Sequence, residues 1–156
     1  MSRHRLTRTR LATVTAAAAA AVASVLVSRW ALRALRGGAR HLAGPLWLRL
    51  TANSGISFSI GAHWSVTTVL EAIVALVVVI AAWNARGMLV GVGFGLLTGG
   101  GVANTVDRLT SPGGRVPDFI AVGGFPVFNV ADVAVTLGAA VLIVEVLRGR
   151  PLVGRP

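Results

Sequence analysis

The sequence contains neither cysteine nor lysine, and only 13% of its 156 residues are charged. Without cysteine, disulfides, thiol nucleophiles and thiolate metal sites are all excluded. The three histidines, His4, His41 and His63, lack the spacing of metal ligands. The net charge of +10 therefore comes from arginine alone, and the arginines flank apolar runs without interleaved aromatic side chains. This pattern predicts anionic membrane lipids as partners and gives no support for nucleic-acid binding.

Long apolar runs dominate the sequence. Hydrophobic residues make up 54% of a chain of one-domain length, which is too apolar for an ordinary soluble fold. One run is bracketed by Trp64 and Trp83, which on a helix lie roughly 30 Å apart, the thickness of the hydrocarbon layer. The next run has Gly91, Gly95 and Gly99 at a spacing that lets another helix approach closely. We predict an all-α membrane protein, a single integral domain over residues 1–156, with four transmembrane helices at about 11–27, 65–82, 88–106 and 130–147.

The first apolar run has two interpretations. Its basic start, apolar middle and Ala21-Val22-Ala23 resemble a cleavable signal peptide. The three later runs favour a retained helix, because an even number of helices places both termini on one side. Eight of the fifteen arginines fall in the 23 residues of the termini and the 84–87 connection, and seven in the 60 residues of loops 28–64 and 107–129. The positive-inside rule then predicts cytoplasmic termini and two outer loops, 28–64 and 107–129.

The first outer loop is too long for a simple connection. Leu46, Leu48 and Leu50 alternate with polar or aromatic residues, which is typical of a strand. Asn53-Ser54-Gly55 then supplies a turn, and residues 56–60 return as a second strand. We therefore expect a small extracytoplasmic β hairpin at the membrane surface.

Two of the five acidic side chains stand at the ends of apolar runs: Asp107 closes the third and Asp132 opens the fourth. Ionisable groups at membrane depth are costly, so they are functional candidates. Two carboxylates held close share a proton, and such a pair hydrolyses amides by activating water with one member and protonating with the other. Each follows an asparagine, Asn104 or Asn129, by three residues, within reach on a helix. The simpler alternatives are a helix-dipole role for Asp132 and an interfacial ion pair between Asp107 and Arg108.

Three blocks of this sequence resemble the lipoprotein signal peptidase (signal peptidase II) family of bacterial aspartyl proteases. The first block is similar to the family's Asn-x-Gly-x-x-Phe-Ser, and the second to Gly-Gly-x-x-x-Asn-x-x-Asp-Arg-Leu. The third is similar to Asp-Phe-Ile followed by Phe-Asn-x-Ala-Asp. In this chain the blocks are Asn53-Ser54-Gly55-Ile56-Ser57-Phe58-Ser59, Gly99 to Leu109, and Asp118-Phe119-Ile120 with Phe128-Asn129-Val130-Ala131-Asp132.

The resemblance implies an intramembrane aspartyl endopeptidase that cleaves prolipoproteins on the amino side of a diacylglyceryl-modified cysteine, without cofactor or metal. It implies Asp107 and Asp132 as the catalytic pair. It also favours four residues as substrate contacts or organisers of the site, namely Asn53, Asn104, Arg108 and Asn129. We expect a monomer in the bacterial cytoplasmic membrane, with the active site near the outer leaflet.

Two further acids have plainer interpretations. Asp118 either structures the second outer loop or supports the site. Glu145 lies beside Arg148 at the end of the fourth run, and we predict that it is a surface acid.

The first helix departs from the family pattern, which carries an aspartate and a lysine near its outer end. This chain has Val25-Leu26-Val27-Ser28-Arg29-Trp30 there, with no carboxylate and with Arg29 or Arg33 in place of the lysine. The departure leaves open a non-catalytic or weakly active paralogue that binds lipidated proteins. A small proton-coupled transporter is the other alternative, but both acids lie at helix ends and no inverted repeat is visible.

Overall fold

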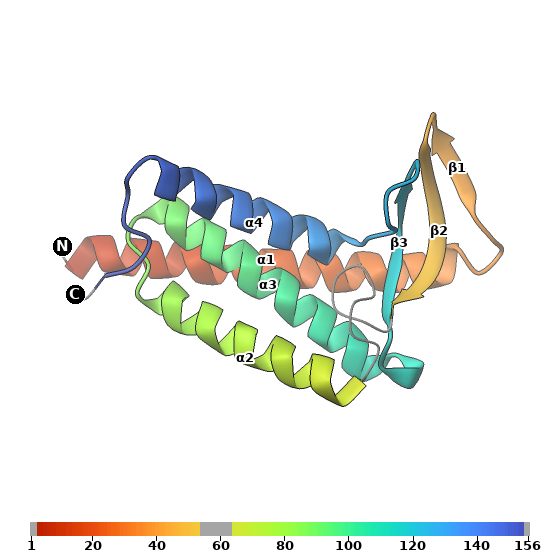
Figure 1. The fold of residues 1–156 in the computed structure, drawn as a ribbon, viewed down its shortest axis with the longest axis horizontal. Coiled ribbons are helices and arrows are strands. Elements are labelled where there is room, and N and C mark those ends of the chain that lie inside the picture. Colours follow the sequence, from red (N-terminus) through yellow and green to blue (C-terminus); the bar gives the residue numbers. More distant parts are fainter. Residues whose placement is uncertain (1–2, 54–63, 155–156) are drawn as a thin grey trace.

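Four helices lie lengthwise beside one another, with a small sheet at one end of the bundle and both chain termini at the other (Figure 1). The computed structural model describes residues 3–53 and 64–154. The predicted strand over residues 56–60 lies outside the described residues. The elements are α1 (Arg3–Ala34), β1 (Arg40–Ala43), β2 (Leu46–Asn53), α2 (Trp64–Trp83), α3 (Met88–Thr110), β3 (Val116–Val122) and α4 (Val130–Leu147).

The four predicted helices are confirmed, and α1 is much longer than expected. Within the described residues, three helices are long and apolar enough to cross a membrane, and α2 contributes the shorter apolar stretch Ile73–Trp83. Helix α1 has 32 residues, because arginine and alanine both favour helix and extend it beyond the apolar run. The three spanning segments are Leu6–Ala34, Met88–Thr110 and Val130–Leu147.

Small residues let α1 and α3 pack with their backbones almost in contact. A Cβ atom on Gly95 would lie 2.5 Å from the carbonyl oxygen of Thr13, and one on Gly99 would lie 2.4 Å from that of Ala17. Both distances are too short for any larger residue, so the predicted close approach at these glycines is confirmed. The tight interface supports α1 as a retained helix of the bundle.

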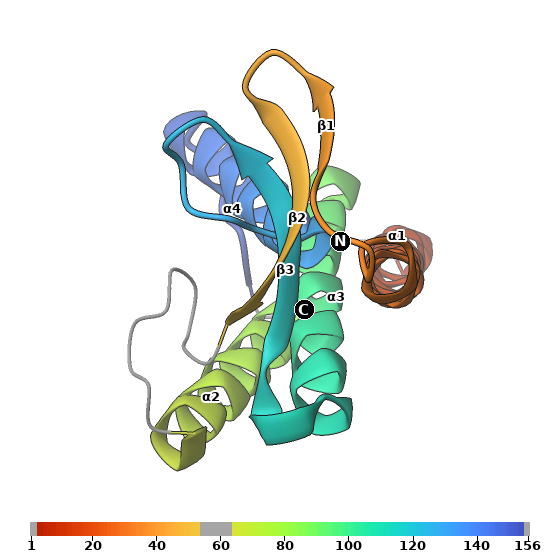
Figure 2. The ribbon, with the colours of Figure 1, turned by 90° about the vertical axis from the view of Figure 1, so that its right-hand side faces the viewer.

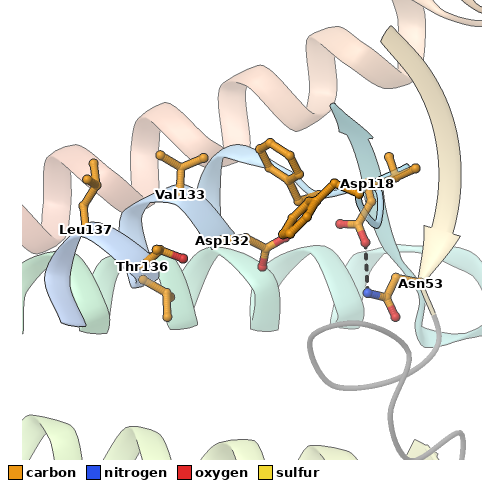
Figure 3. A pocket seen from close by; sticks show the side chains of 10 residues that line it. Asn53, Asp118, Asp132, Val133, Thr136 and Leu137 are labelled. Atoms are coloured by element: carbon orange, nitrogen blue, oxygen red, sulfur yellow. Dashed lines mark hydrogen bonds between the residues drawn. The ribbon is translucent and has the colours of Figure 1, made fainter. Parts of the chain in front are cut away.

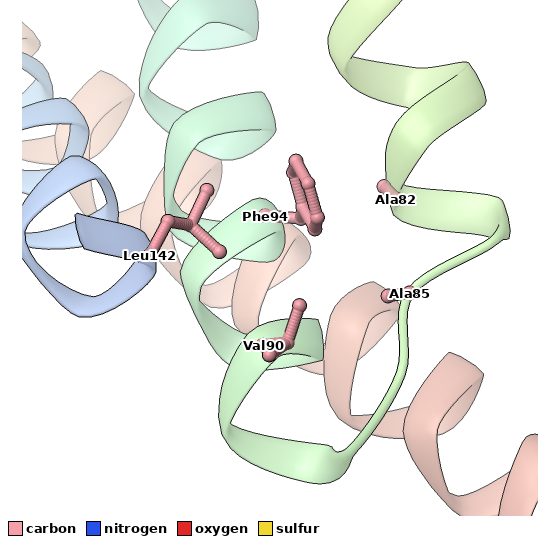
Figure 4. Close-up of a cluster of buried hydrophobic side chains, with 5 residues drawn as sticks. All are labelled: Ala82, Ala85, Val90, Phe94 and Leu142. Carbon is pink, nitrogen blue, oxygen red and sulfur yellow. The ribbon is translucent and has the colours of Figure 1, made fainter. Parts of the chain in front are cut away.

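The end of the bundle that holds the termini has its own apolar core (Figure 4). Phe94 and Val90 of α3 meet Leu142 of α4 and two alanines, Ala82 and Ala85, at the end of α2 and just beyond it. The C-terminal segment closes this end, because residues 152–154 pair with the connection between α2 and α3 through backbone hydrogen bonds of 2.9 and 3.2 Å.

The sheet is assembled from both predicted outer loops. Its order is β1-β2-β3, all antiparallel, so β2 pairs with β1 and with β3. The three strands cross the end of the bundle in front of α3 and α4 (Figure 2). Asn53 is the last residue of β2, paired with Val116, and the rest of the predicted turn at 53–55 lies outside the described residues. The local pattern of residues 46–50 was that of a strand, but the partner strand β3 lies far along the chain.

The C-terminal end of α1 is held by this sheet. Ala31 and Leu35, which are 0% and 4% exposed, form a cluster with Phe119 of β3, and Leu48 of β2 packs against it. Burying these side chains explains why α1 continues beyond the apolar run used to predict it. The same cluster fixes β3, and therefore the residues beside Phe119, relative to the helices.

Candidate active site

Helix α4 begins with a reciprocal pair of hydrogen bonds between Asn129 and Asp132. The Asn129 side-chain oxygen accepts from the Asp132 backbone N–H at 3.0 Å, and the Asp132 carboxylate accepts from the Asn129 backbone N–H at 3.0 Å. This capping box satisfies two backbone donors at the helix start. It also fixes the Asp132 carboxylate in the first turn of α4.

The amide groups of Asn104 and Asn129 join α3 to α4 and to β3. Asn104 Nδ2 donates to Asp132 Oδ1 at 3.1 Å. Asn129 Nδ2 donates to Asn104 Oδ1 at 3.1 Å and to Asp118 Oδ1 at 2.8 Å. Asn129 is 1% exposed, and its side chain uses both amide hydrogens and its oxygen in this network. One asparagine therefore links the two carboxylates, Asp118 and Asp132.

Asp118 lies on β3, is 3% exposed, and accepts a second amide hydrogen from Asn53 Nδ2 at 2.9 Å (Figure 3). Burial raises the pKa of Asp118 from the ordinary 3.8 to about 6, and the negative charge of Asp132 acts in the same direction. The hydrogen bonds from Asn53 and Asn129 and the positive charge of Arg108 oppose this rise in pKa. Asp118 therefore keeps its proton to a higher pH than an exposed aspartate does.

A kink in the register of β2 brings Asn53 to Asp118. Leu48 pairs with Ile120, but Thr51 pairs with Asp118, so β2 carries one extra residue between these pairs. Such a bulge reverses which side chains face each side of the strand beyond it. Asn53 consequently lies on the same face of the sheet as Asp118. Without the extra residue, Asn53 would lie on the opposite face.

Asp118 and Asp132 both line one cavity of about 290 Å³, near the lower end of the range for small-molecule sites. Its polar wall is formed by Asn53, Asp118 and Asp132 (Figure 3). The rest of the wall follows α4 and the segment before it and is mostly apolar, with Thr136 as its other polar member: Phe125, Val127, Phe128, Val133, Val135, Thr136 and Leu137. The cavity therefore presents carboxylates at one end of an apolar surface.

Asp107 lies elsewhere, between α3 and α1, and is not among the residues that line this cavity. It is 2% exposed, is hydrogen-bonded by the Ser28 hydroxyl, and has Arg29 Nη2 at 3.7 Å from its Oδ1. The neighbouring Arg108 is 3% exposed and donates to the Gly114 carbonyl at 3.3 Å. Of the residues predicted for the site, Asn53, Asn104, Asn129 and Asp132 are brought together, and Asp107 is not.

The sequence predicted Asp107 as the partner of Asp132, but the acid that the hydrogen-bond network joins to Asp132 is Asp118. A signal was present, since Asp118 is an acid within the apolar run Val116–Val122, which forms a strand with four consecutive buried residues. Within residues 3–53 and 64–154, no group of three or more His, Asp or Glu side chains is placed to hold a metal ion.

A bundle of apolar helices with two linked carboxylates at one end defines a multi-pass membrane protein with a pair of acids beside one cavity. Residues 16–148 match the family described as Signal peptidase (SPase) II, and the chain belongs to this family. It is 41% identical over 118 residues to a lipoprotein signal peptidase of Rhodococcus jostii, covering 67% of this chain and 59% of that protein. A lipoprotein signal peptidase of Chlorobium phaeobacteroides is 40% identical over 117 residues, covering 63% of this chain and 71% of that protein.

The fold agrees with solved structures. Two structures described as bacterial membrane enzymes superpose with TM-scores of 0.73 and 0.75, each at 22% sequence identity. The first match covers 87% of both chains, and the second covers 86% of this chain and 92% of the other. The arrangement of helices and sheet is therefore that of a known membrane fold.

Proposed function

We propose that this chain is an aspartic endopeptidase that removes signal peptides from diacylglyceryl-modified prolipoproteins, cutting on the amino side of the lipidated cysteine. The observation that carries the proposal is the pair Asp118 and Asp132. Asn129 donates to both carboxylates, to Asp118 from its side-chain amide and to Asp132 from its backbone N–H, and both acids line one cavity. Family membership and the names of the relatives support the choice of substrate. An apolar wall beside the carboxylates suits a substrate that carries acyl chains.

The working pair is Asp118 and Asp132. Asp118, whose pKa is about 6, holds the shared proton. Asp132 removes a proton from water as the water oxygen attacks the carbonyl carbon of the scissile amide. Asp118 donates its proton to the carbonyl oxygen, which gives a gem-diol intermediate. When the carbon–nitrogen bond breaks, the proton held by Asp132 passes to the leaving nitrogen and one gem-diol hydroxyl returns its proton to Asp118, so both carboxyl groups regain their starting state.

The asparagines hold this pair in place. Asn129 donates its amide hydrogens to Asn104 and to Asp118, and Asn104 donates to Asp132, so the two asparagines orient the acids. Asn53 does the same for Asp118 from the sheet. We still predict that these three asparagines and Arg108 contact the substrate. In the bound state, some of their hydrogen bonds within the site would be replaced by hydrogen bonds to the substrate.

The orientation follows from charge and from the shared position of the termini. Both termini lie at the end of the bundle opposite the sheet (Figure 1). The high arginine density of the terminal segments supports a cytoplasmic position for that end. The cavity then lies near the outer leaflet of the bacterial cytoplasmic membrane, where an exported prolipoprotein presents its lipidated cysteine.

The test is a cleavage assay in liposomes with a diacylglyceryl-modified prolipoprotein and its unlipidated form. We expect lipid-dependent cleavage that falls by at least about 10³-fold in both Asp118→Asn and Asp132→Asn. Asp107→Asn is the discriminating variant, and we expect it to retain much more activity than either.

Two results would overturn parts of this proposal. Wild-type rates in Asp118→Asn, with loss in Asp107→Asn, would restore Asp107 as the partner of Asp132. A folded wild-type protein that binds the lipidated substrate without cutting it would establish the non-catalytic relative instead.

A further inference from the structure

Arg29 of α1 is joined to two residues in the last turn of α3. Its Nη2 atom lies 3.7 Å from Asp107 Oδ1, and the same nitrogen donates a hydrogen bond to the Thr110 hydroxyl. Thr110 in turn donates to the Val106 carbonyl at 2.6 Å. A single nitrogen of the Arg29 guanidinium therefore contacts both partners in this turn.

The buried Asp107 carboxylate makes this connection important. Asp107 is 2% exposed, and its Oδ1 atom has no hydrogen-bond donor among the described residues. A buried carboxylate without a compensating charge is unfavourable, so the guanidinium of Arg29 compensates for the burial. Ser28, the preceding residue of α1, hydrogen-bonds the same carboxylate. Helix α1 lacks the aspartate that the family pattern carries near this end. Arg29 of α1 is paired with Asp107 of α3.

The next residue of α3 connects this pair to the site. Arg108 is 3% exposed and donates to the carbonyl of Gly114, in the single 3₁₀ turn Pro112–Gly114 that precedes β3. Its positive charge also acts on Asp118. Because Asp107 and Arg108 are adjacent, whatever fixes Asp107 against α1 also fixes the backbone from which Arg108 reaches the turn before Asp118.

We propose that Arg29 is a positioning residue: it clamps the last turn of α3 to α1, so that Arg108 holds the turn before β3 and with it Asp118 opposite Asp132. This inference rests on the proposed peptidase function. Asp107 is then part of the clamp, which accounts for its burial away from the cavity. Arg33, one turn further along α1 and exposed, is outside the clamp and serves as a matched control.

The test compares Arg29→Gln, Arg29→Lys, Thr110→Val and the control Arg33→Gln in the full chain in liposomes. We expect Arg29→Gln to lower kcat by about 10²-fold with less than about a threefold change in KM, because displaced catalytic groups slow chemistry more than binding. Arg29→Lys and Thr110→Val each keep half of the clamp, so about tenfold losses are expected. Arg33→Gln is expected to match the wild type.

The pH profile separates positioning from a general loss of folding. Asp118 is faced by Asn53 from β2, Asn129 and Asp132 from α4, and Arg108 from α3. If Arg29→Gln lets Arg108 move away, the opposing positive charge is lost and the limb of the profile set by Asp118 shifts to higher pH. An unchanged profile, or a loss of kcat that only follows the fraction of folded protein, would overturn the proposal.

A second measurement does not depend on turnover: infrared spectroscopy follows the titration of the Asp118 carboxyl band. The band is identified by subtracting the spectrum of the Asp118→Asn variant. The band is expected to titrate at higher pH in Arg29→Gln than in the wild type and the Arg33→Gln control. If the wild type does not cleave substrate, the peptidase function fails, and this titration alone decides whether Arg29 positions Arg108 and Asp118. Identical titrations in all three proteins would reject the positioning role.

Discussion

The two carboxylates that line the cavity and the buried Glu145 at the other end of the bundle are bound by different kinds of side chain. At the sheet end, the side-chain hydrogen bonds to Asp118 and Asp132 come from asparagine amides. At the end with the termini, Glu145 is bound by two arginines, Arg148 at 3.2 Å and Arg150 at 2.9 Å. Both kinds of donor favour the ionised carboxylate, but an arginine adds a full positive charge, whereas a neutral amide adds none and leaves the carboxylate easier to protonate. The partners of an acid therefore indicate whether it serves structure or chemistry.

Glu145 also corrects a prediction. It was expected to be a surface acid, but it is 2% exposed because Arg148 and Arg150 fold over it. The two arginine side chains are 56% and 60% exposed, so water screens the pairs and their contribution to stability is small. Their role is to direct the C-terminal segment back across the end of the bundle.

The strongest way to break the amide-held pair, short of removing an acid, is Asn129→Ala. This change removes the amide that links Asp118 to Asn104 and also removes the cap of α4. We expect kcat/KM to fall by about 10²-fold or more, together with about 1 kcal/mol of stability from the lost cap. Cleavage rates and thermal unfolding in the same detergent measure the two effects.

Asn129→Ser separates them, because serine caps a helix as asparagine does but is too short to supply the bridging amide. We expect stability close to that of the wild type with activity still low. Full activity in Asn129→Ser would mean that only the cap matters and that the bridge to Asp118 has no role.

The pH dependence sharpens the comparison. Asp118 has a raised pKa of about 6, so its acidic form persists well above pH 3.8 and is lost as the pH rises through about 6. We expect kcat/KM to decline above that pH, by about tenfold for each further pH unit, as the proton donor disappears. Rates measured between pH 5 and 8 check this, and a flat profile would show that Asp118 is not the proton donor.

Asn53→Ala weakens only one side of the network. Its amide lowers the pKa of Asp118, so its loss should move the decline in kcat/KM to higher pH and reduce the maximum rate by about tenfold. Thr51→Val is the matched control, because Thr51 is exposed on the same strand and pairs with Asp118 through the backbone. Equal pH profiles for the two variants would contradict this role of Asn53.

The smallest effect is expected at the arginine-held acid. Glu145→Gln should leave the cleavage rate within about twofold of the wild type, because the exposed ion pairs contribute little and lie at the far end of the bundle. The same protein should show a small fall in its melting temperature. A large loss of cleavage would mean that the two ends of the molecule are coupled.

The helices could be predicted because membrane-spanning runs are long and have a composition of their own. The bounds of α4 agree with the predicted 130–147, whereas the ends of α1 depend on a tertiary contact between Ala31, Leu35 and Phe119. The sheet was harder, since β2 pairs with a strand from the other loop. Local periodicity identifies a strand but does not choose its partner.

The site shows the same division. The contact between Asn129 and Asp132 was predicted because a spacing of three residues at a helix is a local property, whereas Asn104, expected to reach Asp107, binds Asp132 across two helices. The choice between Asp107 and Asp118 depends on the direction in which each acid points after folding. Asp107 turns toward α1 and its arginine, whereas Asp118 is brought to Asp132 by the sheet. The spacing of Asp107 or Asp118 in the sequence does not predict the direction in which its side chain points.

The capping box of α4 also ties the chemistry to membrane thickness. Helix α4 has 18 residues, which at about 1.5 Å each gives a length of roughly 27 Å, close to the hydrocarbon thickness of about 30 Å. Because Asp132 lies in the first turn, its height above the bilayer centre is set by the helix itself. A thicker bilayer would draw that turn into hydrocarbon and a thinner one would lift it into water, so the lipid composition of the membrane becomes a variable of the reaction.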